Sequence, residues 1–182
     1  MFNEVLNLSF DNHTQKHGKK LSVINEDDPI YFWFFVRVRI DTRQDKFIMS
    51  GTTGGIRTGR QIDFEKDLWS NLSRRQIAVG PFESKNEAVN AKRLYKTKKK
   101  LIKSLPKGEV PSQVTWFAVT FEQSPRLRIF VIKRAPGAVF TGSEQMFIDA
   151  FFEQLNYKLL TIGPFYNYDQ AELAKRLYRK NE

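Results

Sequence analysis

Lysine and arginine are the residues of this chain whose clustering could bind a ligand. From Lys92 to Lys107 the sequence contains no acidic residue. A cluster this dense repels itself unless an anion lies nearby, so it predicts either a solvated helix or a surface that binds acidic protein, nucleic acid or another anionic polymer. The interaction candidates in this cluster are Lys92, Arg93, Lys96, Lys98, Lys99, Lys100 and Lys103.

Two further candidates, Arg57 and Arg60, lie in a glycine-rich segment, residues 51–60 (GTTGGIRTGR). Glycine-rich turns can cradle phosphate groups, but this segment lacks the Lys-Ser/Thr ending of a P-loop and the spacing of a dinucleotide fingerprint. A related stretch, residues 134–143 (RAPGAVFTGS), lacks both arginines at the matching positions. Only the turn-forming residues persist, so we predict a flexible connection.

Groups suited to metal binding or acid–base catalysis are sparse. His13 and His17 are four residues apart, but turn residues surround them and no third ligand is evident. Asp27 and Asp28 precede Pro29 and are typical of a linker. The chain has no cysteine, which excludes thiol chemistry, disulfides and thiolate metal sites. We therefore expect no catalytic residue, no metal, no cofactor and no enzymatic activity.

The arginine and lysine candidates up to Lys96 lie in a unit that occurs twice. Residues 77–96 (IAVGPFESKNEAVNAKRLYK) recur 83 positions later as residues 160–179 (LTIGPFYNYDQAELAKRLYR). The same ungapped offset extends the repeat to residues 31–96 and 114–179. Such self-similarity indicates a duplicated architecture, independently of the secondary-structure propensity of individual residues. The shared motif, expected in the core, comprises Gly80, Pro81, Phe82, Gly163, Pro164 and Phe165.

Each copy is predicted to contain strand, strand, helix, strand and helix. The first strand should be buried at its start and half exposed at its end, where Arg37 and Arg39 alternate with apolar residues. Ser84 and Glu87 have the spacing of a capping box. Two helices on one face of a small antiparallel sheet would make each copy an α+β sandwich. The predicted strands are 31–40, 46–50, 76–82, 114–122, 126–133 and 158–165, and the predicted helices are 62–72, 84–100, 143–156 and 169–179.

The chain divides into an N-terminal arm (1–30), a first repeat (31–100), a linker (101–113) and a second repeat (114–182). In the arm, Leu6, Leu8 and Phe10 alternate with polar residues, which indicates a short strand. This strand either pairs with a sheet edge of another chain or folds back on its own domain as a hairpin. Each repeat is near the lower size limit for independent stability, so we expect the two to pack together.

The strand end at 79–82 (VGPF), followed by a helix with Ala88 and Leu94, resembles the SPOR domain family. In the second copy the matching residues are 162–165 (IGPF), Ala171 and Leu177. Members of that family have a small ferredoxin-like sheet backed by helices, and they bind septal peptidoglycan glycan strands stripped of stem peptides. The resemblance implies two tandem, divergent SPOR-like units of ferredoxin-like fold, and it implies glycan binding as a function.

Composition bears on the partners. The formal net charge is +10, and Phe, Tyr and Trp number 16, 6 and 3, which favours acidic partners and large apolar contacts. No apolar run is long enough to span a bilayer, and the N-terminus is too polar for a signal peptide. We expect no membrane insertion and a location in a virion or the cytoplasm.

These features together predict a non-enzymatic structural subunit of a large assembly. The predicted role is a bacteriophage virion component, such as a neck, connector or tail ring, which contacts other protein subunits as a homo-oligomeric ring. Two alternatives stay open. One is SPOR-type peptidoglycan binding, and the other is a nucleic-acid-binding subunit of a ribonucleoprotein.

Overall fold

The computed structural model describes residues 26–96, 113–127, 129–133 and 136–179. No helix within these ranges is long and apolar enough to cross a membrane. Several predictions concern residues outside the described ranges and are not tested by the structure. These are the strand of the N-terminal arm, His13, His17, Lys98, Lys99, Lys100, Lys103 and nearly all of the linker.

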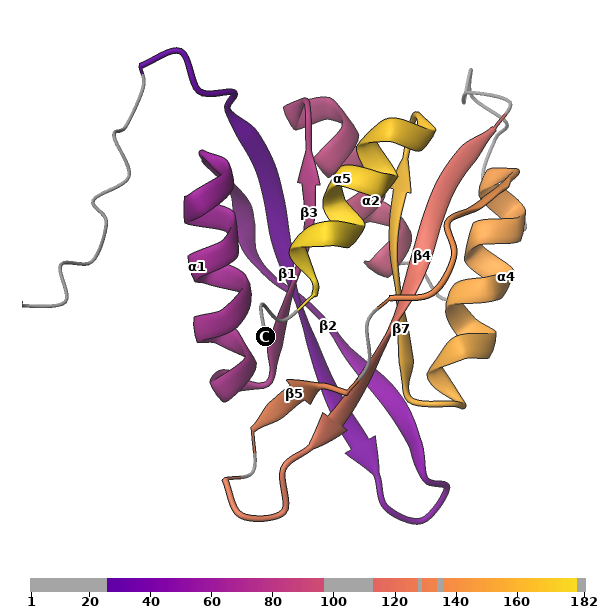
Figure 1. The fold of residues 1–182 in the computed structure, drawn as a ribbon. Coiled ribbons are helices and arrows are strands. Elements are labelled where there is room, and N and C mark those ends of the chain that lie inside the picture. The colour runs from indigo at the N-terminus through magenta and orange to yellow at the C-terminus, as the bar shows by residue number, and fades with distance from the viewer. Residues whose placement is uncertain (1–25, 97–112, 128, 134–135, 180–182) are drawn as a thin grey trace, which may run out of the picture.

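The first repeat forms one antiparallel sheet with strand order β2-β1-β3 (Figure 1). Its third strand has the bounds that the sequence predicts, and its first helix begins and ends one residue early. The elements are β1 (Tyr31–Asp41), β2 (Lys46–Gly59), α1 (Gln61–Asn71), a short 3-10 helix η1 (Leu72–Arg74), β3 (Gln76–Phe82) and α2 (Lys85–Lys96).

The second repeat differs in that two short strands, β5 and β6, take the place of β2; β4 pairs with both on one side and with β7 on the other. Its elements are β4 (Val114–Gln123), β5 (Phe130–Ile132), β6 (Phe140–Gly142), α4 (Glu144–Leu155), β7 (Leu159–Phe165) and α5 (Tyr168–Leu177). The strand register nevertheless recurs: Phe32 opposes Phe82 in the first sheet, and Thr115 opposes Phe165 in the second. The described chain is therefore mixed α+β, with two antiparallel sheets and four α-helices.

The glycine-rich segment is part of a strand, and the prediction of a flexible connection is wrong. β2 extends to Gly59 and does not end at Ser50. Its ladder with β1 shifts register twice, and Gly51 and Gly54, which lie at these shifts, have positive φ angles of 123° and 67°. Glycine adopts such angles without the steric cost that a Cβ atom brings. These glycines thus permit an irregular strand.

The two helices of a repeat lie on opposite faces of the sheet, which corrects the predicted arrangement on one face. The Trp33 ring contacts Phe64 of α1, with centroids 5.7 Å apart, whereas the Phe34 ring contacts Tyr95 of α2 at 5.3 Å. Successive side chains on a strand point to opposite faces, so α1 and α2 flank the sheet (Figure 1). On the inner face, α2 also packs against β7 of the second repeat.

An approximate internal twofold axis relates the repeats. Three residues contact their own counterparts 83 positions away, as only residues on such an axis can do. The Phe82 and Phe165 rings stack with centroids 5.0 Å apart. The other two pairs are Phe47 with Phe130, whose ring centroids are 5.7 Å apart, and Glu87 with Gln170, which form a hydrogen bond of 3.2 Å. Both repeats therefore contribute to one core, as expected.

The inner edges of the two sheets are joined by tyrosines. The Tyr178 hydroxyl donates to the carbonyls of Ala78 (2.6 Å) and Gly80 (3.2 Å) on β3. Tyr95 makes the same two bonds, with the same lengths, to the carbonyls of residues 161 and 163 on β7. Burial raises the pKa of both phenols well above the usual 10.0. Each repeat thus supplies a hydroxyl donor for buried carbonyl groups on the other repeat's edge strand.

The repeated motif is structural. Phe82, Phe165 and Leu94 are buried, as predicted, whereas Leu177 is only partly buried. A Cβ atom added at Gly80, whose φ is +149°, would lie 2.9 Å from the Trp33 Cβ, so this position requires glycine. The helix signal is confirmed too, because Ser84 and Glu87 form the reciprocal bonds of a capping box, each 3.2 Å long.

Replacing Phe165 by alanine should lower the free energy of unfolding by about 3–5 kcal/mol, because the ring is fully buried between Phe82 and Phe117. Chemical denaturation measures the loss. Tyr157→Ala, at a side chain 66% exposed, is the matched control and should change stability by about 0.5 kcal/mol or less. Equal effects of the two substitutions would contradict a central position for Phe165.

Tyr178→Phe should cost about 1–3 kcal/mol at neutral pH, because two buried carbonyls lose their donor. The folded protein retains the phenolic proton that the unfolded chain loses above pH 10, so this contribution is complete below pH 10 and falls as the pH rises. The expected decline is about 1.4 kcal/mol per pH unit per buried tyrosine. Denaturation at pH 9–11 should show a smaller decline for Tyr178→Phe than for Tyr157→Phe, and identical slopes would refute the assignment.

Candidate interaction surfaces

The predicted basic residues that the structure describes lie in two separate places. On α2, the Lys92 ammonium donates to the carbonyl of Gly54, and Arg93 pairs with Glu144 at 3.4 Å. The Arg93 side chain is 47% exposed, so this ion pair contributes little stability. Lys96 is the last residue of α2. Lys92 therefore connects α2 to β2, and Arg93 connects α2 to α4. The acidic partner of Arg93, Glu144, belongs to this same chain.

Arg57 and Arg60 lie apart from that helix, where β2 leads into α1. The Arg57 guanidinium carbon is 5.5 Å from the centroid of the Phe35 ring, a cation–π arrangement. The backbone amide of Arg60, the residue that precedes α1, donates to the Asp63 carboxylate (2.9 Å). Arg60 thus has a capping role, whereas the exposed Arg57 side chain is available to a partner.

The structure adds Arg37 and Arg39 to the candidate residues. Both side chains are exposed, and on β1 they share a face with Phe35. Within the described ranges no ion pair involves either of them. Asp41 lies farther along the same face, and its carboxylate accepts a hydrogen bond from the backbone amide of Arg43 in the turn that follows (2.9 Å). We call Arg37, Arg39 and Arg57 the arginine face; the alternating sequence of β1 was the signal that could have revealed it.

On the second repeat an apolar patch occupies the corresponding place. The exposed Phe140 ring stacks on Trp116 with centroids 6.4 Å apart, and the exposed Met146 lies in the first turn of α4. A Cβ atom at Gly142 would be 2.8 Å from Trp116 and 2.9 Å from the Met146 sulfur. These two side chains therefore flank one glycine. We call Trp116, Phe140 and Met146 the apolar patch.

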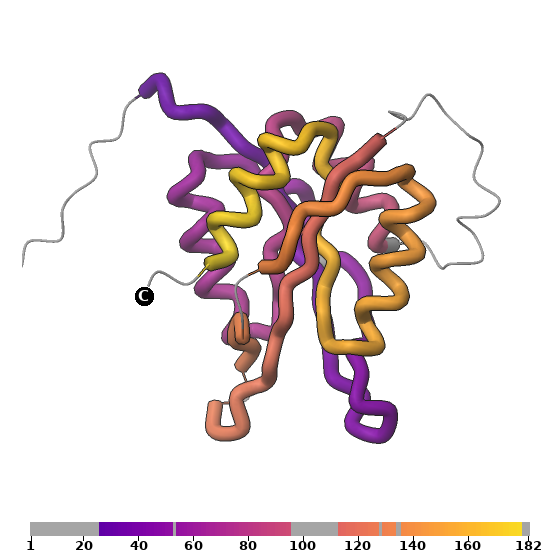
Figure 2. The backbone as a smooth tube through the Cα atoms, turned by 45° about the vertical axis from the view of Figure 1, so that its right-hand side comes forward, coloured from indigo at the N-terminus to yellow at the C-terminus, as the bar shows by residue number. Residues whose placement is uncertain are grey.

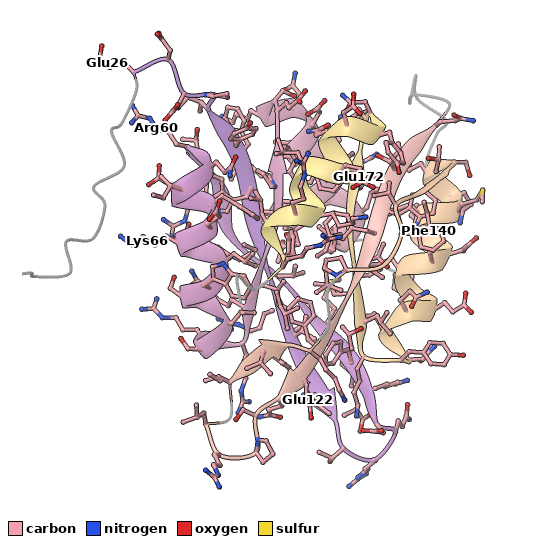
Figure 3. All side chains as sticks on the ribbon, viewed as in Figure 1. Glu26, Arg60, Lys66, Glu122, Phe140 and Glu172 are labelled. Carbon is pink, nitrogen blue, oxygen red and sulfur yellow. The ribbon has the colours of Figure 1, made fainter. Side chains whose placement is uncertain are left out.

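Equivalent surface positions of the two repeats differ in chemistry. Arg57 occupies the position of Phe140, and Asp63 that of Met146. Two more charged residues, Arg74 and Lys85, correspond to the exposed aromatic residues Tyr157 and Tyr168. Figure 3 shows Phe140 on the side of α4, opposite Arg60 and Lys66 on the side of α1. The α1 side thus has charged residues at the positions where the α4 side has the exposed Phe140 and Met146.

A groove of about 640 Å³ lies between β2 and the C-terminal end of α4. Every residue from Lys46 to Thr52 lines it along the strand, and Tyr95, Phe152, Leu155 and Asn156 complete it. The Thr52 hydroxyl oxygen is buried and has no hydrogen-bond partner among the described residues. The groove therefore has a largely apolar wall on the helix side, as binding sites commonly do.

The Gly-Pro-Phe motif is not part of any open surface. Gly80, Pro81, Phe82 and their three counterparts are buried, and the two phenylalanines stack on each other. Neither ring is therefore free to stack on a sugar or a base. In the part of the chain that the structure describes, no group of three histidine, cysteine, aspartate or glutamate side chains could hold a metal ion.

Comparisons of this chain with protein-family models, with curated proteins and with solved structures found no match in any of the three. The surfaces described above are therefore interpreted from their own chemistry.

Proposed function

We propose that this protein is a non-enzymatic structural subunit of a large assembly, in which copies contact one another head to tail. The observation that carries the proposal is the divergence of the two repeats at their surfaces, where Arg57 and Asp63 occupy the positions that Phe140 and Met146 have in the second repeat. An exposed Phe and Met beside a buried Trp form an apolar surface that a partner protein can cover.

Charge supports the same arrangement. α4 carries Glu144, Asp149 and Glu153 and has no basic residue. Arg60 and Lys66 lie on the other side of the molecule (Figure 3), where α1 also carries Asp63, Glu65 and Asp67. If the apolar patch and the acidic residues of α4 meet Arg57 and Arg60 of the next copy, the interface is heterologous, and it closes into a ring when the rotation between copies permits it. The assembly that we propose is a homo-oligomeric ring.

Within this class, the role that we propose is a bacteriophage virion component, such as a neck, connector or tail ring. The support is the combination of a basic, aromatic-rich chain with an internally duplicated fold. We also propose that each repeat is a SPOR-like, ferredoxin-like unit, on the basis of the Gly-Pro-Phe strand end and its helix. Glycan binding by these units would have to use a surface other than the buried Phe82 and Phe165.

Nucleic-acid binding is a second candidate function, and the arginine face favours it. Arg37, Arg39 and Arg57 are exposed on one face of the first sheet. Guanidinium groups bind phosphate in bidentate geometry. Sheet faces with basic and aromatic residues can bind single strands, although Phe35 here is only 5% exposed. The expected ligand of this face is a phosphate backbone.

The double substitution Phe140→Arg and Met146→Asp should leave the fold intact, because it installs the residues that the first repeat has at these positions. It should weaken self-association by about 30-fold or more, as expected for loss of an aromatic interface anchor. Sedimentation velocity across a concentration series measures this. Leu127→Gln, which removes another exposed apolar side chain (67% exposed), is the control. A wild-type chain that stays monomeric at every concentration, or shows turnover of a substrate, would refute the proposal.

If the arginine face binds phosphate, the chain should bind DNA or RNA with an affinity that falls steeply with salt. Arg37→Gln with Arg39→Gln should then reduce the slope of log affinity against log salt by about two, because each lost phosphate contact contributes about one. Arg74→Gln with Arg126→Gln removes the same charge from other exposed positions and is the control. Equal slopes for the two double variants would exclude the arginine face as the binding site.

A further inference from the structure

The groove beside β2 has the architecture of a strand-addition site. β2 pairs only with β1 among the described strands, so its outer edge has no strand neighbour there. Apart from the ladder with β1, no backbone hydrogen bond joins residues 46–52 to another described segment. Such an edge offers unused amide and carbonyl groups along the whole length of the groove.

Two described contacts lie near the walls of the groove. Asp45, in the turn that precedes β2, pairs with Lys158, which follows α4. Phe47 packs on Phe130 across the internal axis. The edge strand and the helix end therefore lie close together, as in recognition sites where a peptide lies between a strand and a helix.

The chemistry of the groove defines what it can bind. Tyr95, Phe152 and Leu155 line it on the helix side, and Met49 lines it on the strand side. An added strand would point alternate side chains towards this apolar wall and the others to solvent. The groove is suited to a short extended segment with apolar residues at every second position.

The chain itself contains such a segment before the first described residue. Residues 6–10 (LNLSF) place Leu6, Leu8 and Phe10 at alternate positions. Tyr31 pairs with Gly59, at the opposite end of β2 from Lys46. Figures 1 and 2 show the chain from residue 26 on the far side of the molecule from α4. The arm therefore leaves from the side opposite the groove, which matches a donor for the next copy.

We propose that residues 6–10 of one copy add as a strand to the β2 edge of a neighbouring copy, in the groove against α4. This inference rests on the proposed head-to-tail assembly and supplies its second contact. The 15 residues between this segment and residue 26 span up to about 50 Å when extended, enough to reach a neighbour. An arm that docks in this groove of a neighbouring copy makes the contact heterologous, so it propagates around a ring.

Because the chain contains no cysteine, cross-linking of engineered cysteines tests the proposal in the full-length protein. One chain carries Ser9→Cys, and a second chain carries Ser50→Cys at the exposed groove edge. After mixing and treatment with a short bismaleimide, covalent dimers should form about tenfold more than with Lys133→Cys, because docking raises the local concentration of the thiols. Lys133 is the counterpart of Ser50 in the second repeat and is also exposed.

A synthetic peptide of residues 2–13 should compete and reduce the Ser9–Ser50 product to the level of the Lys133 control. Equal yields at Ser50 and Lys133, in a chain that still associates in sedimentation, would overturn the arm docking but leave the proposed assembly standing. A chain that carries both Ser9→Cys and Ser50→Cys reports docking within one copy. If that chain cross-links only to itself as a monomer, the groove binds its own arm, and the proposal is wrong.

Discussion

The unpaired edges of β3 and β7 are the constraint on which the rest of the structure depends. Carbonyls on a strand edge lose much free energy if they are buried without a donor. Tyr178 and Tyr95 supply those donors, each to the other repeat's strand, with matching bonds of 2.6 and 3.2 Å. Neither repeat can therefore complete its sheet alone. The reciprocal bonds explain why two small units, each near the size limit of a stable domain, form one shared core.

These reciprocal bonds and the shared core restrict which positions can diverge between the repeats. Gly80 and Gly163 are both retained, because an added Cβ would lie 2.9 Å from the Trp33 Cβ in one repeat and 3.0 Å from the Thr115 carbonyl oxygen in the other. On the axis, Phe82 packs on Phe165, so a change in either affects both sheets. Side chains that point to solvent have no such requirement. Differences between the repeats therefore accumulate at the surface, where partners bind.

The sequence allowed much of the fold to be predicted, because the repeat offset aligns the strands and Ser84 with Glu87 indicates a helix start. Two errors have physical causes. Glycines such as Gly54 are common in loops, and sequence alone does not distinguish a loop from a strand with register shifts. The apolar side of a helix says nothing about which sheet face it covers. The candidate site was harder to predict, because the partners of Lys92 and Arg93 lie 38 and 51 residues away.

The divergence of the surfaces also determines how copies of the chain can associate. If both repeats had kept Phe140 and Met146, the molecule would present two identical apolar faces related by its internal axis, and contacts would join like with like. With Arg57 and Asp63 at the matching positions, only the second repeat has this apolar patch. Helix α4, which carries Met146, borders the groove at its other end. A molecule whose two sides differ has a direction, and a directional subunit favours rings or filaments over a closed twofold pair.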